Sequence, residues 1–175
     1  MKKISAFEVA ISALACALAT GFLVLGTITP VLLFTAYMVA CVALMLPLTK
    51  QSYWGYVLAY LGTVILSLIF CGFAFVFDLL PFIVFFGLHP LVNELQIKWK
   101  LKKWPAFFVK ALWFDGAMYL VLHFIFEVTT AVEWLTPYLI PIVLVVGTAF
   151  FLFYDFTMFS LRTQVNKLVK RIYKK

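Results

Sequence analysis

Apolar runs, each long enough to cross a lipid bilayer, follow one another from residue 4 to about residue 161, and positive charge marks every second junction between them. The other three junctions contain no Lys or Arg. Because basic residues stay on the cytoplasmic side during insertion, the pattern predicts an all-α integral membrane protein with six transmembrane helices and both termini in the cytoplasm. The basic residues at these junctions are Lys2, Lys3, Lys50, Lys98, Lys100, Lys102, Lys103, Arg162, Lys167, Lys170, Arg171, Lys174 and Lys175.

The composition excludes a soluble domain of this size, because 66% of the 175 residues are hydrophobic and only 12% are charged. We expect a six-helix transmembrane domain over residues 1–161 and a basic amphipathic cytoplasmic tail over residues 162–175. The net charge of +7 lies at the predicted cytoplasmic flanks, where it favours anionic lipids of the inner leaflet rather than nucleic acid. The expected location is multi-pass in a bacterial plasma membrane.

The first run follows Met-Lys-Lys, as in a signal peptide, but its removal would spoil the charge alternation, so we interpret it as a retained helix. Asp78 is expected to cap the fourth helix. Pro90 is expected to kink that helix near Phe86. The tail is either a continuation of the last helix or a helix on the inner leaflet. The expected helices span residues 4–25, 31–48, 53–75, 78–97, 105–128 and 137–161.

Ionisable groups within the apolar runs cost about 2.5–3.5 kcal/mol each on insertion scales, so each needs a partner or a function. Counting depth along the helices places Glu94 beside Lys110 and His89 beside Asp115, and these are the expected pairs. The group is open to three interpretations: a structural network, a coupling or proton-handling relay, or a catalytic site. This intramembrane polar network comprises His89, Asn93, Glu94, Lys110, Asp115 and Asp155.

Four polar residues recur at intervals of four on the fifth helix and form a stripe from mid-membrane towards the outer surface. The stripe either binds a ligand or faces the membrane interface, where water from the outer side reaches it. His123 and Glu127 have a workable two-ligand spacing for a metal, but His89 is too deep to be a third ligand, so we expect no metal. The cysteines Cys16, Cys41 and Cys71 lack metal-ligand spacing. The stripe comprises Asp115, Tyr119, His123 and Glu127.

The first helix carries Ser12-Ala13-Leu14-Ala15-Cys16-Ala17-Leu18-Ala19, and small residues four apart allow close approach of another helix. With six helices and this length, the chain resembles the substrate-binding S components of energy-coupling factor (ECF) vitamin transporters. The resemblance implies that Ala13 and Ala17 contact a transmembrane coupling subunit. It also implies an outward ligand pocket. Together with Tyr119 from the stripe, the candidate substrate-binding residues are Asp78, Tyr119, His123, Glu127, Trp134 and Tyr138.

The predicted function is therefore capture of a small metabolite from outside, within a vitamin-uptake transporter whose ATPase subunits are separate chains. The outer junctions carry acidic residues and no Lys or Arg, which favours a cationic or amine-bearing ligand. The alternatives are a membrane-embedded enzyme or lipid-handling protein that uses His89, Glu94 and Asp115, and a non-catalytic accessory protein. No nucleotide or hydrolase motif is present, so we expect no enzyme activity and no cofactor.

Overall fold

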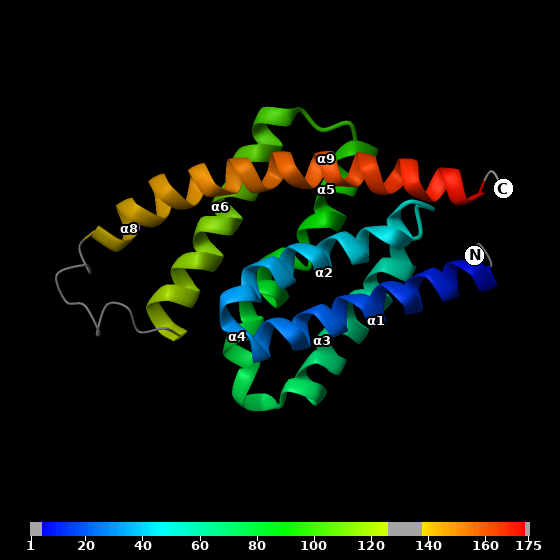
Figure 1. Cartoon of the computed structure of the whole chain (residues 1–175). Coiled ribbons are helices and arrows are strands. Elements are labelled where there is room, and N and C mark those ends of the chain that lie inside the picture. Colours follow the sequence, from blue (N-terminus) through cyan, green and yellow to red (C-terminus); the bar gives the residue numbers. More distant parts are fainter. Residues whose placement is uncertain (1–4, 126–137, 174–175) are drawn as a thin grey trace. The chain divides into compact units, whose positions relative to one another are not determined.

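The computed structural model of the chain describes residues 5–125 and 138–173, and over these residues it consists of helices without strands (Figure 1). Within the same residues, six helical segments are long and apolar enough to cross a membrane, which confirms the predicted all-α fold with six spans. Their bounds are Ala6–Ile28, Pro30–Leu48, Tyr53–Cys71, Phe73–Lys98, Lys103–His123 and Leu139–Arg171.

The chain divides into two compact units, which we describe separately. The larger unit comprises Met1–Leu95 and Met158–Lys175, and the smaller unit comprises Gln96–Thr157. The last helix is shared between them, because α9 runs without interruption over Thr148–Tyr173. The helix therefore continues through the segment that the sequence left open as either a continuation or a separate surface helix.

Helix α1 (Ala6–Ile28) is the centre of the larger unit and packs against α2 (Leu33–Leu48) and α3 (Tyr53–Cys71) (Figure 1). It begins with a capping box, in which Ser5 Oγ accepts from Glu8 N–H and the Glu8 carboxylate accepts from Ser5 N–H. Ala15 and Ala19 are completely buried, because small residues let the neighbouring backbones approach closely. A short 3-10 turn, η1 (Pro30–Leu32), leads into α2.

The fourth span is broken, as Pro90 predicted. It consists of η2 (Phe73–Phe75), α4 (Val76–Pro81), the π-helical turn η3 (Phe82–Phe86) and, after a short turn, α5 (His89–Lys98). The expected cap at Asp78 is wrong: Phe75 is the N-cap of α4 and makes no side-chain capping bond, and Asp78 lies in the first turn. The preceding 3-10 turn already brings the chain into α4 and makes that cap unnecessary.

Side chains from α2 and α3 satisfy the backbone carbonyls that this break frees. Pro90 has no N–H to give to Phe86, and the Cys41 thiol donates to Phe86 O instead, at 3.0 Å. The hydroxyl of Tyr56 donates to Gly87 O. The hydroxyl of Tyr60 donates to Ile83 O, at 2.7 Å. A helix break at membrane depth is tolerated where neighbours supply such donors.

The smaller unit is built on α6 (Lys103–Leu120), which ends in the π-helical turn η4 (Val121–Ile125). The sixth span follows as α8 (Leu139–Ile142), the π-helical turn η6 (Val143–Gly147) and the beginning of α9. Phe114 of α6 stacks on Phe150 and Phe151 of α9, with ring centroids 5.9 and 5.6 Å apart. These aromatic contacts hold α6 against the sixth span.

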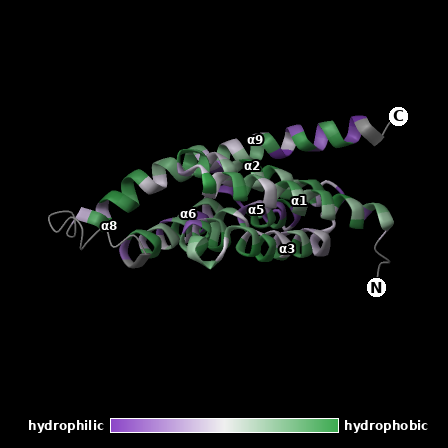
Figure 2. Cartoon of the chain, turned by 60° about the horizontal axis from the view of Figure 1, so that its bottom comes forward, coloured by the Kyte–Doolittle hydropathy of each residue, from purple (hydrophilic) through white to green (hydrophobic). Residues whose placement is uncertain are grey.

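Hydrophobic residues make up most of the helices, while hydrophilic residues gather towards the C-terminal end of α9 (Figure 2). Large apolar side chains such as Val31, Phe73 and Phe156 are more than 70% exposed. A surface of this kind is stable against lipid and not against water. The chain is therefore a multi-pass membrane protein by its length, its composition and the character of its surface.

Candidate functional site

The larger unit contains a buried carboxylate that is paired with a cation from the other end of the chain. Glu94 of α5 is 5% exposed, and its Oε2 accepts from both Nε and Nη2 of Arg162, each at 2.5 Å. The depth count paired Glu94 with Lys110, and that pairing is wrong. Depth was a poor guide because Arg162, although it follows the last apolar run, lies on the face of α9 that packs within this unit.

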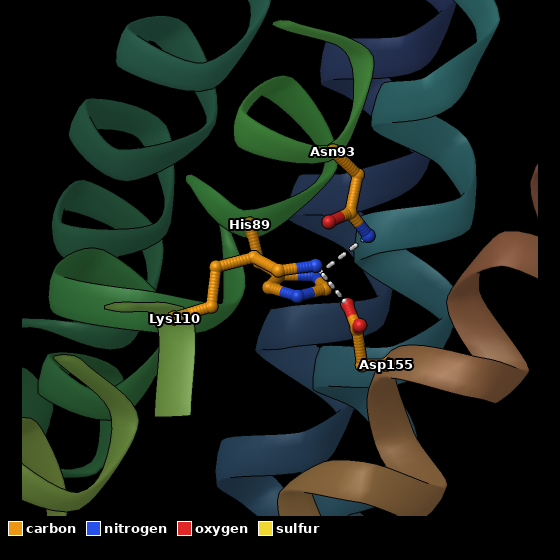
Figure 3. Close-up of polar contacts among 4 residues, drawn as sticks. All are labelled: His89, Asn93, Lys110 and Asp155. Atoms are coloured by element: carbon orange, nitrogen blue, oxygen red, sulfur yellow. Dashed lines mark hydrogen bonds and ion pairs between the residues drawn. The ribbon is translucent and has the colours of Figure 1, made fainter. Parts of the chain in front are cut away.

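His89 and Asn93, two members of the predicted polar network, lie one turn apart on α5. The Asn93 amide nitrogen and His89 Nδ1 are 3.4 Å apart (Figure 3). Both side chains are buried, with His89 completely inaccessible, and the His89 ring centroid lies 5.3 Å from that of Phe85. This contact fixes the imidazole directly after the helix break.

A second buried ion pair lies in the smaller unit. Lys110 Nζ of α6 donates to Asp155 Oδ1 of α9 at 2.6 Å (Figure 3). The Lys110 side chain is 3% exposed and that of Asp155 is 12% exposed. The free-energy cost of removing both charges from water is offset here by a short, charge-assisted hydrogen bond. The pair ties α6 to α9 near the predicted cytoplasmic level.

Asp115 lies five residues further along α6, and only one of its two carboxylate oxygens has a hydrogen-bond partner among the described residues. Its Oδ2 accepts from Thr148 Oγ1 at 2.7 Å, which corrects the expected pairing with His89. Its Oδ1 is buried and, among the residues that the structure describes, has no hydrogen-bond partner. The residue as a whole is 5% exposed. A carboxylate oxygen in such a position is costly unless a donor reaches it.

Gly147 lets the carboxylate lie this close to the sixth span. A Cβ at position 147 would be 2.7 Å from Asp115 Oδ1, inside contact distance. Gly147 is also the last residue of η6, and Thr148 is the first of α9. The wide π-helical turn and the absent side chain together place the Thr148 hydroxyl against Asp115.

Asp115 lines a cavity of about 350 Å³ between α6 and the α8–η6 segment. Tyr119, one turn from Asp115 on the same face, lines the same cavity. Its volume falls in the range of small-molecule sites, which combine apolar walls with few polar groups. We name it the Asp115 cavity; its lining residues are Leu112, Asp115, Gly116, Tyr119, Ile140, Val143 and Leu144.

The structure brings together part of the predicted substrate-binding set. The rings of Tyr119 and His123 are stacked, 5.4 Å apart and 9° from parallel, so Asp115, Tyr119 and His123 form a continuous stripe. Tyr138 is 59% exposed at the N-cap of α8. Asp78 belongs to the larger unit, where its backbone carbonyl accepts from the Tyr37 hydroxyl. Glu127 and Trp134 lie outside the described residues.

Sequence reasoning missed two partners of the buried carboxylates, Thr148 and Arg162. Thr148 is the only hydroxyl residue between Leu139 and Phe153, and a lone hydroxyl after glycine in such a run was a usable signal. Nothing in the sequence marked Arg162 as the partner of Glu94, because a basic residue is expected after the sixth helix in any case.

Two of the three residues in the alternative enzyme hypothesis carry their own partners, since Glu94 binds Arg162 and Asp115 binds Thr148. The Asp115 cavity, by contrast, is lined by Asp115, by the aromatic ring of Tyr119 and by apolar side chains. Such a site can hold a small cation or amine. Comparison of the chain with protein-family models, with curated proteins and with solved structures found no match in any of the three.

Proposed function

We propose that the chain is a membrane-embedded substrate-binding subunit that captures a small amine-bearing or cationic metabolite in the Asp115 cavity. The observation that carries this proposal is the buried Asp115 carboxylate, with one oxygen on Thr148 and the other without a partner among the described residues. An ammonium group in the cavity that donates to the Asp115 carboxylate would compensate the charge of this buried group.

The cavity suits a ligand with one charged end and an apolar body. Tyr119 presents an aromatic ring on which a cation can lie. Leu112, Val143 and Leu144 supply apolar walls. The site therefore selects an organic amine over a hydrated inorganic ion, because an inorganic ion would lose its water shell without enough oxygen ligands to replace it.

The first helix supports a partnership with another membrane subunit. Ala15 and Ala19 are buried within the chain, while Ala13 and Ala17 are exposed on the opposite side of α1. Exposed small residues four apart are suited to close packing of a second helix. We assign this face to a coupling subunit of an ECF-type transporter in the bacterial plasma membrane, with ATP hydrolysis supplied by separate subunits.

Binding of amine metabolites to the purified protein in lipid nanodiscs tests the proposal. A set of vitamins and amines is screened by thermal stabilisation, and the affinity of each hit is then measured by titration calorimetry. Asp115→Asn keeps the shape of the side chain and removes its charge, so we expect a 10- to 100-fold weaker affinity, corresponding to one charge-assisted hydrogen bond of about 1.5–3 kcal/mol.

Asp78→Asn is the matched control, because it removes one carboxylate from a candidate residue that does not line the cavity. We expect its affinity to stay within twofold of the unchanged protein. The proposal fails if no amine binds, or if the two variants lose affinity equally. Co-purification of a coupling subunit that is lost on Ala13→Leu would support the transporter assignment separately.

A further inference from the structure

A second cavity lies in the larger unit, at the end where the basic residues gather. It has a volume of about 520 Å³ and is lined by residues of the α2–α3 turn, α5 and the last turns of α9. Most of its lining residues carry polar side chains, unlike those of the Asp115 cavity. We name it the basic-end cavity.

The charges around this cavity are unbalanced. Lys50, Arg162 and Lys170 line it, and Glu94 is the one acidic residue among its lining residues, which leaves an excess of two positive charges. The positive-inside pattern explains why basic residues occur at this end. It does not require that three of them, from two distant parts of the chain, surround one hollow.

Arg162 is held in a fixed orientation. Its Nε and Nη2 both donate to Glu94 Oε2, at 2.5 Å. Glu94 is itself buried, with only 5% of its surface exposed. A guanidinium carries five N–H donors, so the bonds to Glu94 leave donors for a ligand in the cavity. An oriented guanidinium beside lysine ammonium groups is the usual arrangement for binding phosphate oxygens.

The α2–α3 turn forms a rigid wall of the cavity. Gln51 has a φ of 55°, in the left-handed region that non-glycine residues rarely adopt. The turn holds this conformation by bonds from Gln51 N–H to Leu48 O at 2.9 Å and from Ser52 N–H to Pro47 O at 3.2 Å. Lys50, whose Nζ lies 5.9 Å from the Phe7 ring centroid, is thereby positioned at the cavity rim.

The position of the cavity along α9 places it at the level of lipid headgroups. The sixth span covers 33 residues, or about 50 Å at the rise of an α-helix, whereas the hydrocarbon core is about 30 Å thick. The last turns of the helix, with Asn166 and Lys170, therefore extend beyond the hydrocarbon.

We propose that the basic-end cavity binds one phosphate group, carried either by a phospholipid or by a soluble phosphate ester. Arg162 and Lys170 contact the phosphate oxygens, Asn166 donates its amide N–H groups, and Glu94 positions Arg162. This inference does not depend on the Asp115 cavity or on the transport assignment.

Titration calorimetry on the full chain in an uncharged detergent, at low salt, tests the proposal with two probes. Dioctanoyl phosphatidylglycerol represents the lipid source and glycerol 3-phosphate the soluble source. Dioctanoylglycerol, which lacks phosphate, is the negative control. We expect one equivalent of a phosphate probe to bind, and native mass spectrometry to confirm the stoichiometry.

Charge variants with opposite expected signs distinguish a binding site from a merely structural one. Lys170→Gln should weaken binding about fivefold, because one basic residue near a phosphate has about that effect. Glu94→Gln keeps a side-chain oxygen that can accept from Arg162 and so preserves its position, while it removes the opposing charge, so it should tighten binding by a similar factor. Lys167→Gln, an equal charge change at an exposed residue outside the cavity, should alter binding less than twofold.

Binding of the lipid alone identifies a headgroup site, and binding of both probes identifies a site for soluble phosphate esters; each supports the proposal. The proposal is overturned if neither probe binds, if Lys167→Gln weakens binding as much as Lys170→Gln, or if Glu94→Gln weakens it.

Discussion

Gly147 lies where an added Cβ would meet the Asp115 carboxylate, and we predict that this residue cannot be enlarged. Gly147→Ala would place a methyl group 2.7 Å from Asp115 Oδ1 and push the carboxylate away from Thr148, at a cost of about 1–3 kcal/mol. The midpoint of thermal unfolding in detergent should fall accordingly.

Gly21 of α1 supplies the control for this substitution, because a Cβ there would meet nothing within 4 Å. Gly21→Ala should leave the midpoint unchanged or raise it, since alanine favours a helix by up to about 1 kcal/mol over glycine. Equal destabilisation by both substitutions would show that the close approach at Gly147 is unimportant.

The buried pair of Lys110 and Asp155 gives a second prediction at this scale. Lys110→Met removes the ion-pair partner of a carboxylate that is largely buried, so we expect a loss of about 3–5 kcal/mol. The double variant Lys110→Met/Asp155→Leu should lose less than Lys110→Met alone. Unfolding measurements on the two singles and the double provide the coupling energy, and simple additivity would contradict the assignment.

The sequence predicted which residues would carry buried polar contacts better than it predicted their partners. Depth along a helix follows from counting residues, and it correctly placed Asp115 in the middle of its span. Partner choice also depends on the direction in which each side chain leaves its helix and on which helix lies opposite. Neither quantity is present in one sequence, and so Glu94 and Asp115 received the wrong partners.

At the scale of helices, the break in the fourth span rests on donors from its neighbours, and we predict that these donors are individually important. Tyr56→Phe removes the hydroxyl that donates to Gly87 O and leaves a buried carbonyl without that bond, which costs about 1–3 kcal/mol. Tyr138→Phe, at a residue 59% exposed, should change stability by less than about 0.5 kcal/mol.

Chemical denaturation followed by tryptophan fluorescence measures both tyrosine variants. If Tyr56→Phe proves as harmless as Tyr138→Phe, the break does not depend on its side-chain donors.

Hydropathy and proline positions predicted the helices unevenly. The six apolar runs gave the six spans, and Pro90 indicated the break before α5 because its missing N–H has a local effect. The turns η4 and η6 carried no such signal: the extra residue in a π-helical turn depends on packing against neighbours rather than on local propensity. The length of α9 was also left open, since basic residues are compatible with both a transmembrane continuation and a surface helix.

At the scale of the whole chain, the charge pattern predicts that the α2–α3 turn and the α5–α6 junction lie on the same side of the membrane, opposite the α1–α2 turn. In a variant without native cysteines, Gln51→Cys and Lys100→Cys should react only with reagents that reach the cytoplasm. Thr29→Cys should react with an impermeant maleimide added outside intact cells. Labelling of Gln51→Cys and Lys100→Cys from opposite sides would contradict the six-helix topology.

The thiol that donates to Phe86 O has a practical consequence. Cys41 is completely inaccessible, whereas Cys16 and Cys71 are partly accessible. A small alkylating reagent can therefore modify Cys41 only while the fourth span has moved away from α2. The rate at which Cys41 is alkylated therefore measures how often the fourth span separates from α2. Comparing this rate with and without a bound molecule shows whether binding changes the frequency of that local opening.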